Sequence, residues 1–240
     1  MKKIKLFCLP FAGGNKHCYR DYKARFPSFL NFIPLEYPGR GMRIRESLQT
    51  DMRAIVDDLY YQITDSLEEE YAFYGHSLGG IIAYQLTKKI IDNGRRQPLH
   101  LFVTGSPGPS SVEGKEKNIH LLDKTEFHEE LKKLRGLPDE VLADKALMDF
   151  FEPVLRADFK VSETYLYEET EPMDVPITVI TGSEEDMKQT EIYVWQKESS
   201  RKVDFRVMQG HHFFIYSHVV EIVDIIVQKL ITLQKHYHYE

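Results

Sequence analysis

Gly75-His76-Ser77-Leu78-Gly79 decides the fold of this chain, because of the sequence on either side of it. The apolar stretch Tyr71-Ala72-Phe73-Tyr74 before it is typical of a buried strand, and residues 81–91 after it favour an amphipathic helix. A strand that enters a helix through G-x-S-x-G forms a nucleophile elbow, a sharp turn that exposes the serine hydroxyl above the sheet. The residues two away from the serine on each side must be nearly free of side chain, which explains both glycines.

Strand and helix patterns alternate along most of the chain, which predicts a mostly parallel sheet flanked by helices. Together with the elbow, this alternation predicts an α/β-hydrolase fold, with residues 1–240 as a single domain. The expected strands are residues 4–9, 32–35, 71–74, 99–104, 177–181 and 205–208. The expected helices are residues 19–29, 51–67, 81–91, 188–198 and 219–233.

The segment from about residue 106 to residue 170 breaks this alternation, because it shows helical patterns and no convincing strand. A helical insertion after a strand of a parallel sheet lies over the carboxyl ends of the strands, where ligands bind. We interpret this segment as a lid that covers Ser77 and shapes an acyl pocket. The alternative is a packing subdomain without a gating role, and the sequence is compatible with both.

Composition excludes several classes of protein. A hydrophobic content of 42% and a charged content of 28% are those of an ordinary soluble protein. The net charge of −6 argues against a nucleic-acid partner, since no basic surplus is present to neutralise phosphates. No apolar stretch approaches the ~18 residues of a membrane span. The apolar run after Met1-Lys2-Lys3 is too short for a signal peptide and ends at Pro10, so we expect a cytoplasmic protein.

A serine hydroxyl becomes a nucleophile when a histidine removes its proton and an acid holds that histidine in the correct tautomer. In this fold the acid and then the histidine follow the serine along the chain. His211, His212 and His218 follow the last expected strand, where the base belongs. His211 and His212 are adjacent, so their side chains diverge and one of them can face Ser77.

The acid is expected after the strand at 177–181, where Gly182-Ser183-Glu184-Glu185-Asp186 forms an acidic turn. Either Glu185 or Asp186 could curl back under the histidine. The oxyanion hole requires two backbone N–H groups, one from Leu78 and one from the loop after the first strand. That loop is Leu9-Pro10-Phe11-Ala12-Gly13-Gly14, in which Ala12 is the expected donor and Phe11 the less favoured one.

These residues, taken together, resemble the external, type II thioesterases of nonribosomal peptide and polyketide synthesis. The resemblance covers nearly the whole chain, and its motifs are specific as a set. They are Leu9-Pro10-Phe11-Ala12-Gly13-Gly14, Tyr37-Pro38-Gly39-Arg40-Gly41, Gly75-His76-Ser77-Leu78-Gly79-Gly80 and His212-Phe213-Phe214, together with Leu137-Pro138-Asp139-Glu140-Val141-Leu142 and Leu155-Arg156-Ala157-Asp158-Phe159 in the expected lid.

The resemblance implies that Ser77 is the nucleophile, His212 the base and Asp186 the orienting acid. Thioesterase domains fused to synthetases often carry their acid after the strand that follows the elbow. Here Thr104-Gly105-Ser106 offers no acid, which favours the freestanding type. The chain departs from the family pattern at His211, Met187 and Ser106-Pro107, which affects the expected pocket shape and leaves the triad in place.

The function implied is hydrolysis of acyl or aminoacyl thioesters from the phosphopantetheine of acyl or peptidyl carrier proteins, which clears misprimed synthetase modules. No metal or organic cofactor, no nucleic acid and no membrane would take part, and a monomer is expected. A carboxylesterase or small-molecule acylhydrolase on the same fold is the alternative. A non-catalytic carrier-binding protein is a third reading that an intact Ser, Asp and His disfavours. Arg40, Arg43 and Arg45 could meet an acidic carrier or its phosphate, or could belong to a solvated loop.

Overall fold

A six-stranded parallel sheet forms the centre of the molecule, in the strand order β2-β1-β3-β4-β5-β6. The computed structural model describes residues 2–111, 118–134 and 139–237. The strands are β1 (Ile4–Leu9), β2 (Leu30–Pro34), β3 (Tyr71–His76), β4 (Leu101–Thr104), β5 (Ile177–Gly182) and β6 (Asp204–Met208). β3, β4 and β5 are buried along their whole length, as expected for the interior of a parallel sheet covered on both faces.

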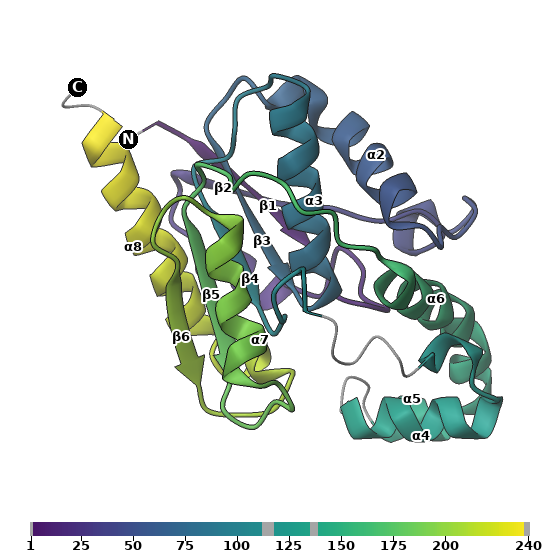
Figure 1. Cartoon of the computed structure of the whole chain (residues 1–240). Coiled ribbons are helices and arrows are strands. Elements are labelled where there is room, and N and C mark those ends of the chain that lie inside the picture. Colours follow the sequence, from purple (N-terminus) through teal and green to yellow (C-terminus); the bar gives the residue numbers. More distant parts are fainter. Residues whose placement is uncertain (1, 112–117, 135–138, 238–240) are drawn as a thin grey trace.

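Helices cover both faces of this sheet (Figure 1). The α-helices are α1 (Arg20–Lys23), α2 (Met52–Ile63), α3 (Leu78–Asp92), α4 (Lys124–Leu134), α5 (Asp139–Ala143), α6 (Lys145–Thr164), α7 (Gln189–Tyr193) and α8 (Val219–Tyr237). One apolar core joins the sheet to α2 and α3 and includes the buried Trp195, which follows α7. A second core joins the opposite face to α1 and α8. No helix of the described residues has the length and apolar character needed to cross a membrane.

The chain changes direction across the sheet at β1, because β2 lies on one side of β1 and β3 on the other. The loops that follow β1 and β3 therefore leave the same edge of the sheet side by side. Such a switch point is where open α/β sheets bind their ligands.

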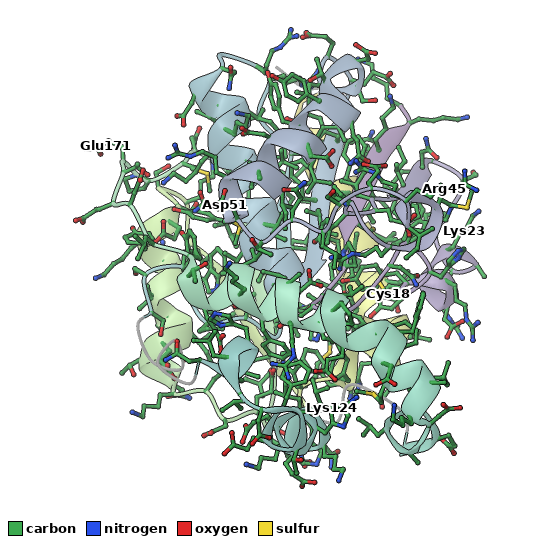
Figure 2. The ribbon with its side chains drawn as sticks, turned by 90° about the vertical axis from the view of Figure 1, so that its right-hand side faces the viewer. Cys18, Lys23, Arg45, Asp51, Lys124 and Glu171 are labelled. Carbon is green, nitrogen blue, oxygen red and sulfur yellow. The ribbon has the colours of Figure 1, made fainter. Side chains whose placement is uncertain are left out.

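The helical insertion expected near 106–170 is present as α4, α5 and α6, between β4 and β5. Figure 1 shows these three helices together beyond the carboxyl ends of the central strands, and Figure 2 shows α6 crossing in front of the sheet. Phe127 and Leu131 of α4 pack with Met148 and Leu155 of α6 in a small core of their own. Positions 112–117 and 135–138 of the expected lid, including Leu137 and Pro138 of the quoted motif, lie outside the described residues.

The helix expected at 19–29 is wrong in length, since α1 is a single turn over Arg20–Lys23. Pro27 accounts for the difference. Proline lacks a backbone N–H and disfavours the helical conformation of the residue before it, which is Phe26. Within the expected range, Tyr19 and Tyr22 are both buried.

Candidate active site

Ser77 lies in the sharp turn between β3 and α3 with φ 54° and ψ −122°, a strained combination for a residue with a side chain. A Cβ at Gly75 would lie 2.2 Å from the carbonyl oxygen of Gly79. A Cβ at Gly79 would lie 2.3 Å from the carbonyl oxygen of Leu9. Both glycines are therefore required by close backbone approach, and the second approach presses the elbow against the loop after β1.

His212 lies in the loop between β6 and the short 3-10 helix Phe214–Tyr216. Its Nδ1 is 2.6 Å from Oε1 of Glu185. The Glu185 side chain is only 4% exposed, and its Oε2 accepts a hydrogen bond from the Gly182 N–H at 2.6 Å. A carboxylate held at both oxygens in this way fixes the orientation of the imidazole and can stabilise its protonated form.

Asp186, which the family resemblance implied as the orienting acid, is exposed to solvent, and Glu185 occupies the position expected of it. The turn after Gly182 is tight, since the Glu185 N–H points at the Gly182 carbonyl at 3.4 Å. It therefore brings the third residue after Gly182 under the histidine instead of the fourth. The neighbouring acid Glu184 contacts His211 on the outside of the loop, with Oε2 2.7 Å from Nε2.

His76 is a part of the site that the sequence did not single out. Its buried ring lies 4.7 Å from the ring of His212, and its Nδ1 is 3.0 Å from Oγ1 of Thr104. Burial lowers the pKa of His76 well below its ordinary value, and the nearby His212 lowers it further. His76 is therefore a neutral packing partner for His212. The sequence feature that could have indicated its role is its position directly before Ser77.

The end of β4 has no room for a side chain next to these groups. A Cβ at Gly105 would lie 2.4 Å from Cε1 of His76 and 3.2 Å from Oε1 of Glu185. Gly105 also adopts a positive φ of 57°, which glycine tolerates best. The glycine after β4 thus leaves the space that the Glu185 carboxylate uses.

The loop Leu9–Gly14 places Ala12 beside the nucleophile. The Phe11 carbonyl accepts a hydrogen bond from the Gly14 N–H at 2.8 Å, which closes the loop into a turn. Ala12 and Ser77 line the same cavity, together with His212. Leu78 is the first residue of α3, so its N–H has no carbonyl of a preceding helical turn to bind. Leu78 thus adjoins Ser77 in the chain, and Ala12 lines a cavity that Ser77 also lines.

Two cavities meet at Ser77. One of about 200 Å³ lies against α4 and α6 and is lined by the apolar side chains of Phe11, Leu131, Leu134, Leu155, Phe159 and Phe213. The other, of about 220 Å³, extends toward α2 and the segment after β4 and carries more polar groups, among them Ser106, Ser111 and Ser162. His212 lines the first cavity.

The parallel sheet, the serine elbow and the histidine loop after the last strand define this protein as an α/β-hydrolase. A family model of the thioesterase domain matches residues 4–230, and the chain belongs to the thioesterase family of thioester hydrolases.

Named relatives are similar over almost the whole chain. The gramicidin S biosynthesis protein GrsT of Aneurinibacillus migulanus is 31% identical over 229 residues, which cover 95% of this chain and 89% of GrsT. The crystal structure of ClbQ from the colibactin NRPS/PKS pathway superposes with a TM-score of 0.92 at 33% identity, covering 97% of this chain and 99% of ClbQ. The RedJ thioesterase of the prodiginine pathway in Streptomyces coelicolor gives 0.86 at 27% identity, covering 95% and 86%.

Proposed function

We propose that this protein is a type II thioesterase that hydrolyses acyl or aminoacyl thioesters from the phosphopantetheine of carrier proteins. The observation that carries the proposal is the buried Glu185, which holds His212 at a cavity shared with Ser77. The similarity to ClbQ of the colibactin NRPS/PKS pathway and to the RedJ thioesterase of the prodiginine pathway supports the choice of substrate.

In the proposed reaction His212 takes the proton of Ser77 while the serine oxygen attacks the thioester carbonyl. The N–H groups of Leu78 and Ala12 stabilise the oxyanion of the tetrahedral intermediate. The C–S bond then breaks, and His212 gives its proton to the departing thiolate. In the second half, His212 takes a proton from water as the water oxygen attacks the acyl-serine carbonyl. The C–O bond to Ser77 then breaks, His212 returns the proton to the serine oxygen, and the carboxylic acid is released. Glu185 remains ionised throughout and orients His212.

The two cavities at Ser77 fit the two sides of a thioester. His212 must reach the leaving sulfur, and it lines the apolar cavity against α4 and α6, so this cavity would receive the end of the pantetheine arm. The second cavity, of about 220 Å³, would then hold the acyl group. Its size favours short acyl groups, as suits an enzyme that removes varied misprimed units.

The alternative is a carboxylesterase or small-molecule acylhydrolase, which would use the same catalytic residues. A non-catalytic carrier-binding role does not account for a buried carboxylate held against a histidine. The expectations of a monomer, of a cytoplasmic location and of a reaction without metal or cofactor stay predictions.

The decisive experiment compares kcat/KM for one acyl group on three donors: an acetylated carrier protein, acetyl-pantetheine and a small acetate ester. Remote binding of the carrier contributes to transition-state stabilisation only in the first case, so we expect the carrier-bound substrate to be hydrolysed most efficiently. Equal efficiency on the carrier and on pantetheine would indicate a general acylhydrolase, and a strong preference for the ester would favour the alternative.

A further inference from the structure

Asp158 of α6 joins three of the sequence motifs at one point. Its Oδ2 accepts a hydrogen bond from the backbone N–H of Gly13 at 2.7 Å. Both of its oxygens also accept hydrogen bonds from Arg40, Oδ2 from Nη1 at 2.6 Å and Oδ1 from Nη2 at 2.7 Å. A lid helix, the loop after β2 and the loop after β1 are thus connected through a single carboxylate.

This connection is fully buried. Asp158 is 0% exposed, and the Arg40 side chain is 5% exposed. Arg45, which follows Arg40 closely in the chain, lies at the surface instead (Figure 2). Arg40 is therefore not free to bind an acidic carrier protein. A buried ion pair is costly to desolvate and weak evidence for stability alone, so a specific role is worth seeking.

Arg40 and its neighbours also hold the loop Leu9–Gly14 at further points. Nη1 of Arg40 lies 3.4 Å from the Gly14 carbonyl oxygen. The hydroxyl of Tyr37 donates to the Pro10 carbonyl at 2.8 Å, and the Arg40 guanidinium lies 5.1 Å from the centre of the Tyr37 ring. The motif around Tyr37 and Arg40 thus serves as a support for the loop that carries Ala12.

The contact at Gly13 fixes the peptide plane immediately after Ala12. The peptide plane between Phe11 and Ala12 carries the Ala12 N–H, and its carbonyl oxygen, that of Phe11, accepts a hydrogen bond from the Gly14 N–H. Gly13 has φ 77°, and a Cβ there would lie 2.4 Å from Cδ2 of Leu155, also on α6. The position of α6 therefore limits the conformation of this loop directly. A preorganised donor must be held in place before the charge develops.

We propose that Asp158, anchored by Arg40, is a positioning residue that holds the Ala12 N–H in the oxyanion hole and so makes this donor dependent on the docking of lid helix α6. The inference rests on the proposed function in one respect, the assignment of Ala12 as an oxyanion donor.

The test replaces Asp158 with asparagine, which is nearly isosteric and offers one acceptor oxygen instead of two. We expect kcat to fall by about 10- to 100-fold, with KM for an acetylated carrier changed by less than about twofold, because the lost interaction is made in the transition state. The affinity for a boronic acid, which forms a tetrahedral anion on Ser77, should fall by a similar factor. The matched control is Asp149→Asn, an exposed acid of the same helix that pairs with Lys124 and Lys145.

Circular dichroism and thermal unfolding establish whether Asp158→Asn is folded. If it is not, Arg40→Lys replaces it with the same readouts, since lysine keeps the charge and loses the two-pronged geometry. A folded variant with wild-type kcat and wild-type boronate affinity, or with a change in KM alone, would overturn the inference.

A parallel series with p-nitrophenyl acetate separates this inference from the proposed function, because ester hydrolysis uses the same oxyanion hole. Loss of kcat in Asp158→Asn on the ester supports the inference even if the wild type fails to hydrolyse the acetylated carrier, which would count against the proposed function. Normal ester turnover by the variant overturns the inference, whatever the wild type does with the carrier.

Discussion

Oε1 of Glu185 lies 2.6 Å from Nδ1 of His212, while the preceding residues of the two loops, Glu184 and His211, contact each other. Two adjacent acids thus face two adjacent histidines, and the two pairs differ in burial. The Glu185 side chain is 4% exposed, and that of Glu184 is 45% exposed. The pair with the buried carboxylate is the one whose histidine lines the same cavity as Ser77.

Glu185→Gln should lower kcat by about 10³- to 10⁴-fold, because an amide neither stabilises the imidazolium nor enforces the correct tautomer. Asp186→Asn is the matched control and should keep activity within about twofold, since that carboxylate is exposed. Steady-state kinetics on an acetylated carrier protein measure both. A crippled Asp186→Asn beside an active Glu185→Gln would restore the assignment that the family resemblance implied.

His212→Ala should be about as damaging as loss of the nucleophile, because both residues act in one proton transfer and their effects do not add. His211→Ala should retain most activity, since His211 contacts the half-exposed Glu184 on the outer side of the loop. The double variant Ser77→Ala/His212→Ala should be no slower than either single variant. The reverse ranking of the two histidines would move the base to His211.

Ser77→Ala should abolish turnover, with a drop on the order of 10³ or more, and leave the melting temperature nearly unchanged. Ser77 is the N-cap of α3, but its side chain makes no capping hydrogen bond, so no cap is lost with the hydroxyl. Thermal unfolding and single-turnover hydrolysis measure the two quantities. Near-native hydrolysis by a folded Ser77→Ala protein would contradict the serine mechanism.

Acid should destabilise the protein before its carboxylates titrate. Burial lowers the pKa of His100 from 6.5 to about 3, and burial also lowers the pKa of His76. Below pH 6.5 these two histidines bind protons in the unfolded chain but stay neutral in the folded protein. The free energy of unfolding therefore falls as pH falls from about 6.5 to 5, by up to about 1.4 kcal/mol per pH unit for each histidine.

Urea unfolding at several pH values between 7 and 5 measures this slope. Nε2 of His100 lies 2.9 Å from Oγ1 of Thr178, and glutamine at position 100 can keep a hydrogen bond to this hydroxyl. His100→Gln should therefore reduce the slope of the unfolding free energy against pH by the contribution of one histidine. His17→Gln, at an exposed position, is the matched control. An unchanged slope in His100→Gln would show that His100 does not resist protonation in the folded protein.

The strands and the elbow could be predicted from the sequence because they depend on local patterns. β1 covers the residues expected for it, and Gly75 and Gly79 stand where close backbone approach requires them. The expected helix at 19–29 was too long, since α1 is a single turn and Pro27 disfavours the helical conformation of Phe26.

The orienting acid could not be chosen from the sequence, because Glu185 and Asp186 differ by one residue in a turn whose hydrogen bonds are set by Gly182. Local sequence patterns also could not predict the partner of Arg40, since Asp158 follows it by 118 positions. A charge pair at such a separation leaves no periodic signal, and Arg40 next to Arg43 and Arg45 looked like part of a basic surface.

The crowding around Gly105 has a consequence for how such enzymes can change over time. Any side chain at this position would collide with His76 and approach the carboxylate of Glu185. A lineage that placed its orienting acid at position 105 would therefore have to move or replace His76 as well. Substitution of Gly105 alone does not create such a site in this arrangement of side chains.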